Sequence, residues 1–151
     1  MTSNSNLEIS IPTDTDGFIL LQCPLCGEYF KLSLDDIHAD DVFQIWCPNC
    51  GLISDNYFTD EVKELALRIM KNQVNSMLQD SLKRMEQKTR GSFISFKANK
   101  TPQKEYEFPI IPGVDTMEIQ HYSCCNRKAK ITTSLKLIGS FCPFCGVRCD
   151  E

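Results

Sequence analysis

Three copies of a short cysteine motif carry the clearest chemistry in this sequence. Each copy reads Cys-Pro-x-Cys-Gly, and the copies occupy residues 23–27, 47–51 and 142–146. Two cysteines separated by two residues can direct both sulfurs toward one tetrahedral ion, while the proline stiffens the turn and the glycine accepts the positive φ that follows the second cysteine. The motif therefore indicates metal-binding turns, with Zn²⁺ as the expected ion.

The first two copies have the spacing of a four-cysteine zinc site. Twenty residues separate Cys26 from Cys47. On these motifs the chain resembles the zinc-ribbon class of domains, in which two such turns at the tips of β-hairpins share one zinc ion. The resemblance covers residues 17–58 well and residues 117–149 less well. It implies that the first zinc ion is bound by Cys23, Cys26, Cys47 and Cys50.

A second zinc site is expected around the third motif, and its other two ligands can be chosen in more than one way. Sixteen residues lie between Cys125 and Cys142, a separation that suits a ribbon with a shorter insert. His121 and Cys124 have the two-residue separation of a metal-binding turn, whereas Asn126 can adopt the left-handed conformation after a second ligand and so favours Cys125. We expect ligation by Cys124, Cys125, Cys142 and Cys145, with His121 as the substitute ligand and Cys149 as a free thiol.

The composition is that of a small globular protein. The chain has 151 residues, 42% hydrophobic and 24% charged, which leaves room for one domain or for two small ones. Domains of about 40 residues rarely bury enough apolar surface to offset chain entropy, so they need a metal or disulfides.

No stretch approaches the roughly 18 apolar residues of a membrane span, and the N-terminus lacks the pattern of a signal peptide, so we expect a cytoplasmic protein. In that reducing compartment, the nine cysteines favour thiolate ligation over disulfides.

Hydrophobic periodicity divides the chain into four segments. Residues 1–16 predict a flexible lead, residues 17–58 the first ribbon, residues 59–90 a long amphipathic helix, and residues 91–151 a β-rich segment with the second ribbon. The helix follows from apolar residues that recur at intervals of three and four. The expected fold is a small, zinc-stabilised α+β protein in which two zinc-ribbon β modules are joined by a long helix.

Shorter alternating patterns predict the strands that must carry the cysteines. Ser33 and Asp36 predict a single helical turn after the second strand. Strands are expected at residues 18–22, 28–32, 42–46, 93–96, 116–122, 129–132 and 136–138.

The expected metal sites argue against an enzyme. Four thiolates fill the tetrahedron around zinc and leave no position for substrate or water. Neither His38 nor His121 is followed two residues later by the glutamate of a zinc deaminase, and the sequence has no phosphate loop or nucleophile elbow. We therefore expect no small-molecule substrate. A dithiol redox protein is the minor alternative, because each motif precedes a strand-like segment and not the helix that lowers a thiol pKa.

The long helix suggests what the protein binds. At about 30 residues it would extend roughly 45 Å, more than a small ribbon can cover. Its apolar stripe either packs on both ribbons or binds a protein partner or a second copy of the chain. Together with closed metal sites, this favours a non-catalytic zinc-binding adaptor that mediates protein–protein interactions as an accessory component of a larger complex.

Nucleic-acid binding is the main alternative. Residues 1–61 hold eleven acidic residues against Lys31 alone, a net charge of −10, so the remainder carries +6 of the total of −4. Zinc ribbons often serve in nucleic-acid machinery, and paired ribbons in one small chain are similar to small subunits and factors of RNA polymerase, although the acidic Asp-Glu tip of the transcript-cleavage ribbons is missing. Basic residues interleaved with aromatic ones are the candidates for such a surface: Arg90, Lys97, Lys100, Lys104, Arg127, Lys128 and Lys130.

Overall fold

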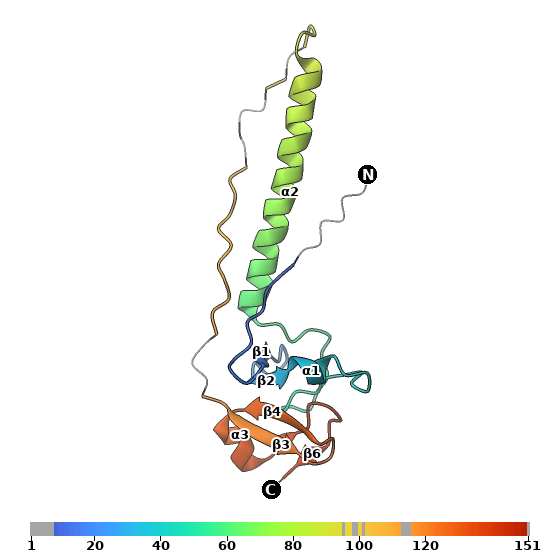
Figure 1. Cartoon of the computed structure of the whole chain (residues 1–151), viewed down its shortest axis with the longest axis vertical. Coiled ribbons are helices and arrows are strands. Elements are labelled where there is room, and N and C mark those ends of the chain that lie inside the picture. Colours follow the sequence, from blue (N-terminus) through green and yellow to red (C-terminus); the bar gives the residue numbers. More distant parts are fainter. Residues whose placement is uncertain (1–7, 95, 98–99, 101, 113–115, 151) are drawn as a thin grey trace. The chain divides into compact units, whose positions relative to one another are not determined.

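The computed structural model describes residues 8–94, 96–97, 100, 102–112 and 116–150 (Figure 1). The chain divides into two compact units. The ribbon unit comprises Ile11–Asp60 and Ile110–Glu151, and the helical unit contains Glu61–Pro109. Both cysteine-rich regions therefore belong to the same unit.

A four-stranded antiparallel sheet forms the centre of the ribbon unit (Figure 1). The strands are β1 (Phe18–Gln22), β2 (Tyr29–Ser33), β3 (Glu118–Tyr122) and β4 (Arg127–Ile131), in the order β1-β2-β4-β3. Each ribbon contributes one hairpin, and β2 pairs with β4 between them. The two ribbons are thus joined in one sheet, whereas the sequence suggested separate modules joined by the helix.

Short elements complete the ribbon unit, and two strand predictions within this unit are wrong. Helix α1 (Leu34–Ile37) follows β2 as predicted, and β5 (Ser140–Phe141) pairs with β6 (Arg148–Cys149). The chain forms no strand over residues 42–46, where Trp46 alone bridges to Ile53. The strand expected at residues 136–138 is the end of helix α3 (Thr133–Ile138).

The physical reason for the second error lies in which side chain is buried. Leu135 is the buried residue of α3, whereas Leu137 and Ile138 are 80% and 67% exposed. The apolar pair therefore marks an exposed helix end and not the inner face of a strand. The strand expected at residues 93–96 is also not formed at Phe93 and Ile94, which lie in a bend, and Ser95 lies outside the described residues.

One hydrophobic core serves both ribbons. It is built from the inner faces of the sheet and from the cysteine-bearing turns. Its fully buried side chains come from both halves of the chain: Phe30, Leu32, Tyr122, Ile131, Pro48, Pro143, Cys23, Cys47 and Cys142. Burial of these cysteines and prolines ties the cysteine-bearing turns to the packing of the sheet.

The helical unit consists of α2 (Asp60–Thr89) and an extended segment beside it (Figure 1). The helix agrees with the predicted range of residues 59–90 to within one residue at each end. We call residues 102–108 the strap. Asn72 forms hydrogen bonds with both main-chain groups of Glu105, and Gln79 donates to the carbonyl oxygen of Pro102. None of the described helices is long and apolar enough to span a membrane.

Candidate metal centres

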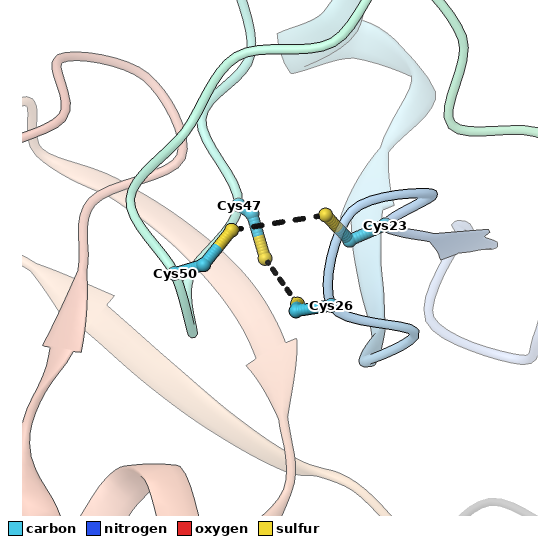
Figure 2. Close-up of side chains that lie close together, drawn as sticks. All are labelled: Cys23, Cys26, Cys47 and Cys50. Atoms are coloured by element: carbon cyan, nitrogen blue, oxygen red, sulfur yellow. Dashed lines mark hydrogen bonds between the residues drawn. The ribbon is translucent and has the colours of Figure 1, made fainter.

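The first cysteine group consists of Cys23, Cys26, Cys47 and Cys50, and the structure brings all four together (Figure 2). The turn between β1 and β2 supplies Cys23 and Cys26, and the second copy of the motif supplies the other two. The four sulfur atoms lie within 4.8 Å of one another. Two hairpin turns therefore converge on one point, as in a zinc ribbon.

The separations between sulfur atoms suit a metal ion and not a disulfide. The Sγ atoms of Cys23 and Cys50 are 3.8 Å apart, and those of Cys26 and Cys47 are 3.5 Å apart. A tetrahedral zinc ion with Zn–S bonds of about 2.3 Å requires sulfurs separated by about 3.8 Å, whereas a disulfide requires about 2.05 Å. The four thiols thus fit a closed tetrahedral site, which would leave zinc no free position for a substrate.

The backbone of each Cys-Pro-x-Cys-Gly turn explains why the motif repeats. In all three turns the glycine N–H donates to the carbonyl oxygen of the first cysteine, at 2.8 to 2.9 Å. Gly27, Gly51 and Gly146 have φ values of +77°, +68° and +72°, which side chains rarely tolerate. The positive φ predicted from the sequence is therefore present in every copy.

The second cysteine group consists of Cys124, Cys125, Cys142 and Cys145, whose sulfur atoms also lie within 4.8 Å of one another. The turn between β3 and β4 has four residues, against six between β1 and β2, and it presents two adjacent cysteines. Asn126 follows them with φ of +53°, as the sequence predicted.

The two other candidate ligands lie outside this second group. His121 is an exposed residue of β3. Cys149 lies on β6, and its Sγ is 3.9 Å from the carbonyl oxygen of Val147. Among the described residues, the four cysteines of this group could thus hold an ion without His121 or Cys149 as a ligand.

The thiols differ in how readily they ionise. Burial raises the pKa of Cys47 and of Cys142 far above the usual range. Partial burial would also raise the pKa of Cys26, but the backbone N–H of Glu28 and the neighbouring thiols outweigh it and lower the pKa to about 7. A bound cation would supply the positive charge that buried thiolates need.

Two buried tyrosines help to position the cysteine turns, and sequence reasoning missed them. The Tyr57 hydroxyl lies 2.8 Å from the carbonyl oxygen of Ile45 and 3.1 Å from that of Leu52, on either side of the second turn, and can donate its one proton to either of them. The Tyr122 hydroxyl bonds to that of Ser140, two residues before Cys142, at 2.8 Å. Burial raises the pKa of each tyrosine to about 12, so both hydroxyls stay protonated and able to donate at neutral pH.

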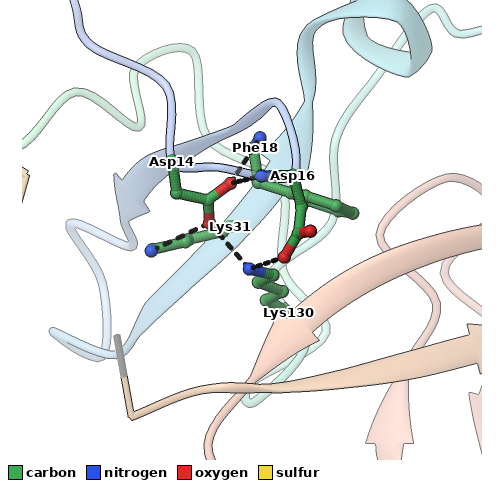
Figure 3. Close-up of polar contacts among 5 residues, drawn as sticks. All are labelled: Asp14, Asp16, Phe18, Lys31 and Lys130. Carbon is green, nitrogen blue, oxygen red and sulfur yellow. Dashed lines mark hydrogen bonds and ion pairs between the residues drawn. The ribbon is translucent and has the colours of Figure 1, made fainter. Parts of the chain in front are cut away.

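Figure 3 shows an ion-pair network at the centre of the sheet, which sequence reasoning also missed. Lys31 and Lys130 lie directly opposite each other on β2 and β4, and both are buried. One carboxylate oxygen of Asp14 lies 3.1 Å from Lys31 Nζ and 2.8 Å from Lys130 Nζ, and Asp16 also reaches Lys130, at 2.7 Å. Asp14 thus bridges two like charges that face each other inside the protein, and Asp16 supplies a second negative charge beside Lys130.

Two of the seven predicted nucleic-acid-binding residues are engaged within the ribbon unit. Lys130 forms the network with Asp14, and Arg127 lies 3.2 Å from Asp36 and 2.6 Å from Asp41. The other five are exposed, but they are divided between the two units: Arg90, Lys97, Lys100 and Lys104 in the helical unit and Lys128 in the ribbon unit.

The apolar stripe of α2 has an exposed part. Six of the helix's apolar side chains are between 49% and 57% exposed. At about 100° per residue these six fall within an arc of about 100°, and Asn72 and Gln79, which hold the strap, lie about 100° or more beyond its nearer edge. We call them the exposed stripe: Leu67, Met70, Val74, Met77, Leu78 and Met85.

Comparison of the chain with protein-family models, with curated proteins and with solved structures finds no match. The resemblance to zinc ribbons therefore rests on the cysteine motifs and on their geometry. This geometry supports the conclusion that two cysteine groups, each with two of its cysteines in a hairpin of the four-stranded sheet, could each hold a metal ion.

Proposed function

We propose that this protein is a non-catalytic, zinc-binding adaptor. In this proposal two zinc ions, one in each cysteine group, stabilise the ribbon unit, and the exposed stripe of α2 binds a protein partner. The observation that carries the proposal is the stripe itself, because six half-exposed apolar side chains on one face of a 30-residue helix are costly in water unless a partner covers them. The absence of an open coordination position in a four-thiolate site supports a structural role for the metal.

The chemistry of the helix indicates what kind of partner would fit. Helix α2 carries six basic and five acidic residues, so its charges nearly balance. Apolar contact is then the main source of affinity, as when an amphipathic helix binds an apolar groove or helix face. Binding of this kind should change little with salt concentration.

Substitution in the stripe tests the adaptor proposal. Val74→Glu places a charge in the middle of the stripe, and Ser76→Glu places the same charge on the opposite face of the same helical turns. We expect a captured partner, or a dimer seen by light scattering, to be lost with Val74→Glu and retained with Ser76→Glu. A chain that remains monomeric and captures no partner, or a partner lost equally with both variants, would contradict the proposal.

A second candidate function is nucleic-acid binding by the helical unit. Lys97, Lys100 and Lys104 are exposed, and Phe93 and Tyr106 nearby in sequence are also exposed, at 110% and 67%. Phosphate contacts by several lysines would make binding fall steeply as salt rises. Fluorescence anisotropy with a labelled single strand should then show a salt-dependent affinity that is lost when the three lysines are changed to glutamate. Salt-independent binding of a protein would favour the adaptor instead.

A further inference from the structure

The two cysteine groups are connected by a reciprocal pair of backbone hydrogen bonds. Trp46, which precedes Cys47, donates its N–H to the carbonyl oxygen of Pro143 at 2.9 Å. Phe141, which precedes Cys142, donates its N–H to the carbonyl oxygen of Pro48 at 2.8 Å. Each cysteine turn therefore accepts a hydrogen bond from the residue that leads into the other turn.

The aromatic rings of the same two residues lie against the opposite turn. A Cβ atom on Gly146 would lie 2.7 Å from Nε1 of Trp46, and one on Gly51 would lie 2.9 Å from Cδ1 of Phe141. Gly27 has a similar φ, yet a Cβ there would meet nothing within 4 Å. Gly51 and Gly146 thus provide a surface for an aromatic ring as well as a positive φ, and Pro48 and Pro143 are fully buried beside them.

We propose that the two cysteine groups bind metal as a coupled pair, so that the chain passes from the metal-free form to the two-metal form with little of the one-metal form between them. The inference rests on the proposed metal centres. Each Zn²⁺ replaces thiol protons, which pass to the solvent, and orders the turns that carry its ligands. Ordering the turn of Cys47 places Pro48 and Gly51 to hold Phe141, and therefore Cys142, in position.

The coupling works equally in the other direction. Ordering the turn of Cys142 places Pro143 and Gly146 to hold Trp46 and therefore Cys47. Binding of the first metal ion therefore includes the entropic cost of ordering both turns. The second ion binds to turns that are already ordered, so its affinity is higher. The two cysteine groups would then fill with metal over a narrower range of metal concentration than two independent sites would.

Native mass spectrometry of the full chain tests this directly. The metal-free protein, kept reduced, is titrated with Zn²⁺, and the populations with zero, one and two ions are measured. Two identical independent sites place about half of the chains in the one-zinc form at half saturation, and unequal independent sites place more there. We expect a clearly smaller one-zinc population. A one-zinc population of half or more overturns the coupling but leaves the metal centres, whereas no zinc binding at all overturns the centres themselves and removes this part of the proposed function.

Variants that keep all nine cysteines locate the coupling. Gly146→Ala and Gly27→Ala introduce the same backbone strain, but only Gly146→Ala meets an aromatic ring of the other cysteine turn. We expect the one-zinc population to rise several-fold with Gly146→Ala relative to Gly27→Ala. Equal populations in these two variants would overturn the proposed contact.

Removal of the Trp46 ring provides an independent test that adds no backbone strain. Trp46→Ala deletes the side chain that lies on Gly146, and Phe43→Ala is its matched control, because Phe43 is 90% exposed. We expect Trp46→Ala to weaken zinc binding at the second cysteine group by on the order of tenfold, which is the usual size of coupling between sites. Unchanged affinity at that group, with folding verified by circular dichroism, would contradict the proposal.

Discussion

The ribbon unit and the helical unit are stabilised in different ways. The ribbon unit buries aromatic and aliphatic side chains from both halves of the chain and encloses Lys31 and Lys130 with their aspartate partner. In α2, by contrast, the described buried residues are Val62 and Asn72. Its strap is held mainly by polar contacts with main-chain atoms, such as those from Asn72 and Gln79.

This difference shows where each unit buries side chains and where apolar side chains stay exposed. A small β unit can be stable alone when metal sites add to a compact core. An isolated helix obtains little stability without packing of an apolar face. The ribbon unit is therefore suited to act as a fixed scaffold, and the helical unit has a surface that a partner could complete.

Loss of a proposed zinc ligand should have the largest effect, and it should affect the ribbon unit far more than the helical unit. We expect Cys47→Ser to unfold the ribbon unit, because structural zinc contributes on the order of 10 kcal/mol in small domains. Trp46 is the single tryptophan of the chain, so its fluorescence reports the ribbon unit, while circular dichroism at 222 nm is dominated by α2. The fluorescence transition should be lost and most of the helical signal retained.

Cys149→Ser is the control for this variant, since Cys149 lies outside both groups of four. It should unfold at nearly the same temperature as the wild type. Simultaneous loss of both signals in Cys47→Ser would show that the two units do not differ in the way described. An unchanged fluorescence transition would show that the metal site does not determine the fold.

The buried ion pairs should account for the next largest effect. Asp14→Asn leaves Lys31 and Lys130 opposite each other without that carboxylate, and breaking a buried pair typically costs about 3 to 5 kcal/mol. We expect a loss of this order in the free energy of unfolding at pH 7, measured by chemical denaturation. Asp16→Asn should cost much less, because that side chain is 54% exposed.

The effect of Asp14 should also depend on pH. Burial would raise the pKa of this carboxyl, but Lys130, the Phe18 N–H and Lys31 outweigh it and hold the pKa well below its usual range. The stabilisation is therefore complete above the unfolded-state pKa of about 3.9 and is lost as pH falls toward the folded-state value. The difference between wild type and Asp14→Asn should shrink below pH 4. A difference that stays constant down to pH 2 would contradict the assignment.

A moderate effect is expected at the contact between helix and strap. Asn72→Ala removes the hydrogen bonds to the main-chain N–H and C=O of Glu105 and should cost about 1 to 3 kcal/mol. Hydrogen exchange at residues 102–108 should become faster while exchange in the sheet stays the same. Gln73→Ala, the adjacent substitution, should leave the strap protected. Faster exchange in the sheet as well would mean that the strap supports both units.

The smallest effect is expected in the exposed stripe. Val74→Ala should change the stability of the isolated chain by less than about 0.5 kcal/mol, because Val74 is 55% exposed. Val62→Ala makes the same chemical change at a position that is 5% exposed, and should cost about 1.5 kcal/mol at roughly 0.8 kcal/mol per buried methylene. Equal losses from the two substitutions would show that the stripe is already covered, for example by self-association.

Local features of the fold could be predicted from the sequence because each depends on neighbouring residues. The three Cys-Pro-x-Cys-Gly turns, the helix over residues 59–90 and the hairpins at Cys23 and Cys124 follow from spacing and periodicity over a few residues. The two errors over residues 42–46 and 136–138 have the same origin. There a short apolar pattern does not reveal whether its side chains are buried, and tertiary packing decides between strand, helix and coil.

The cysteine turns, the long helix and the grouping of eight cysteines into two sets follow from the sequence, since these need contacts only between nearby residues or repeats of one motif. Three other features depend on packing in three dimensions: β2 pairs with β4, Asp14 bridges Lys31 and Lys130, and Trp46 and Phe141 each contact the opposite cysteine turn. Apart from Asp14 and Lys31, which are 17 positions apart, these contacts join residues about a hundred positions apart. Their partners are chosen by shape and charge in three dimensions, for which one sequence carries no periodic signal.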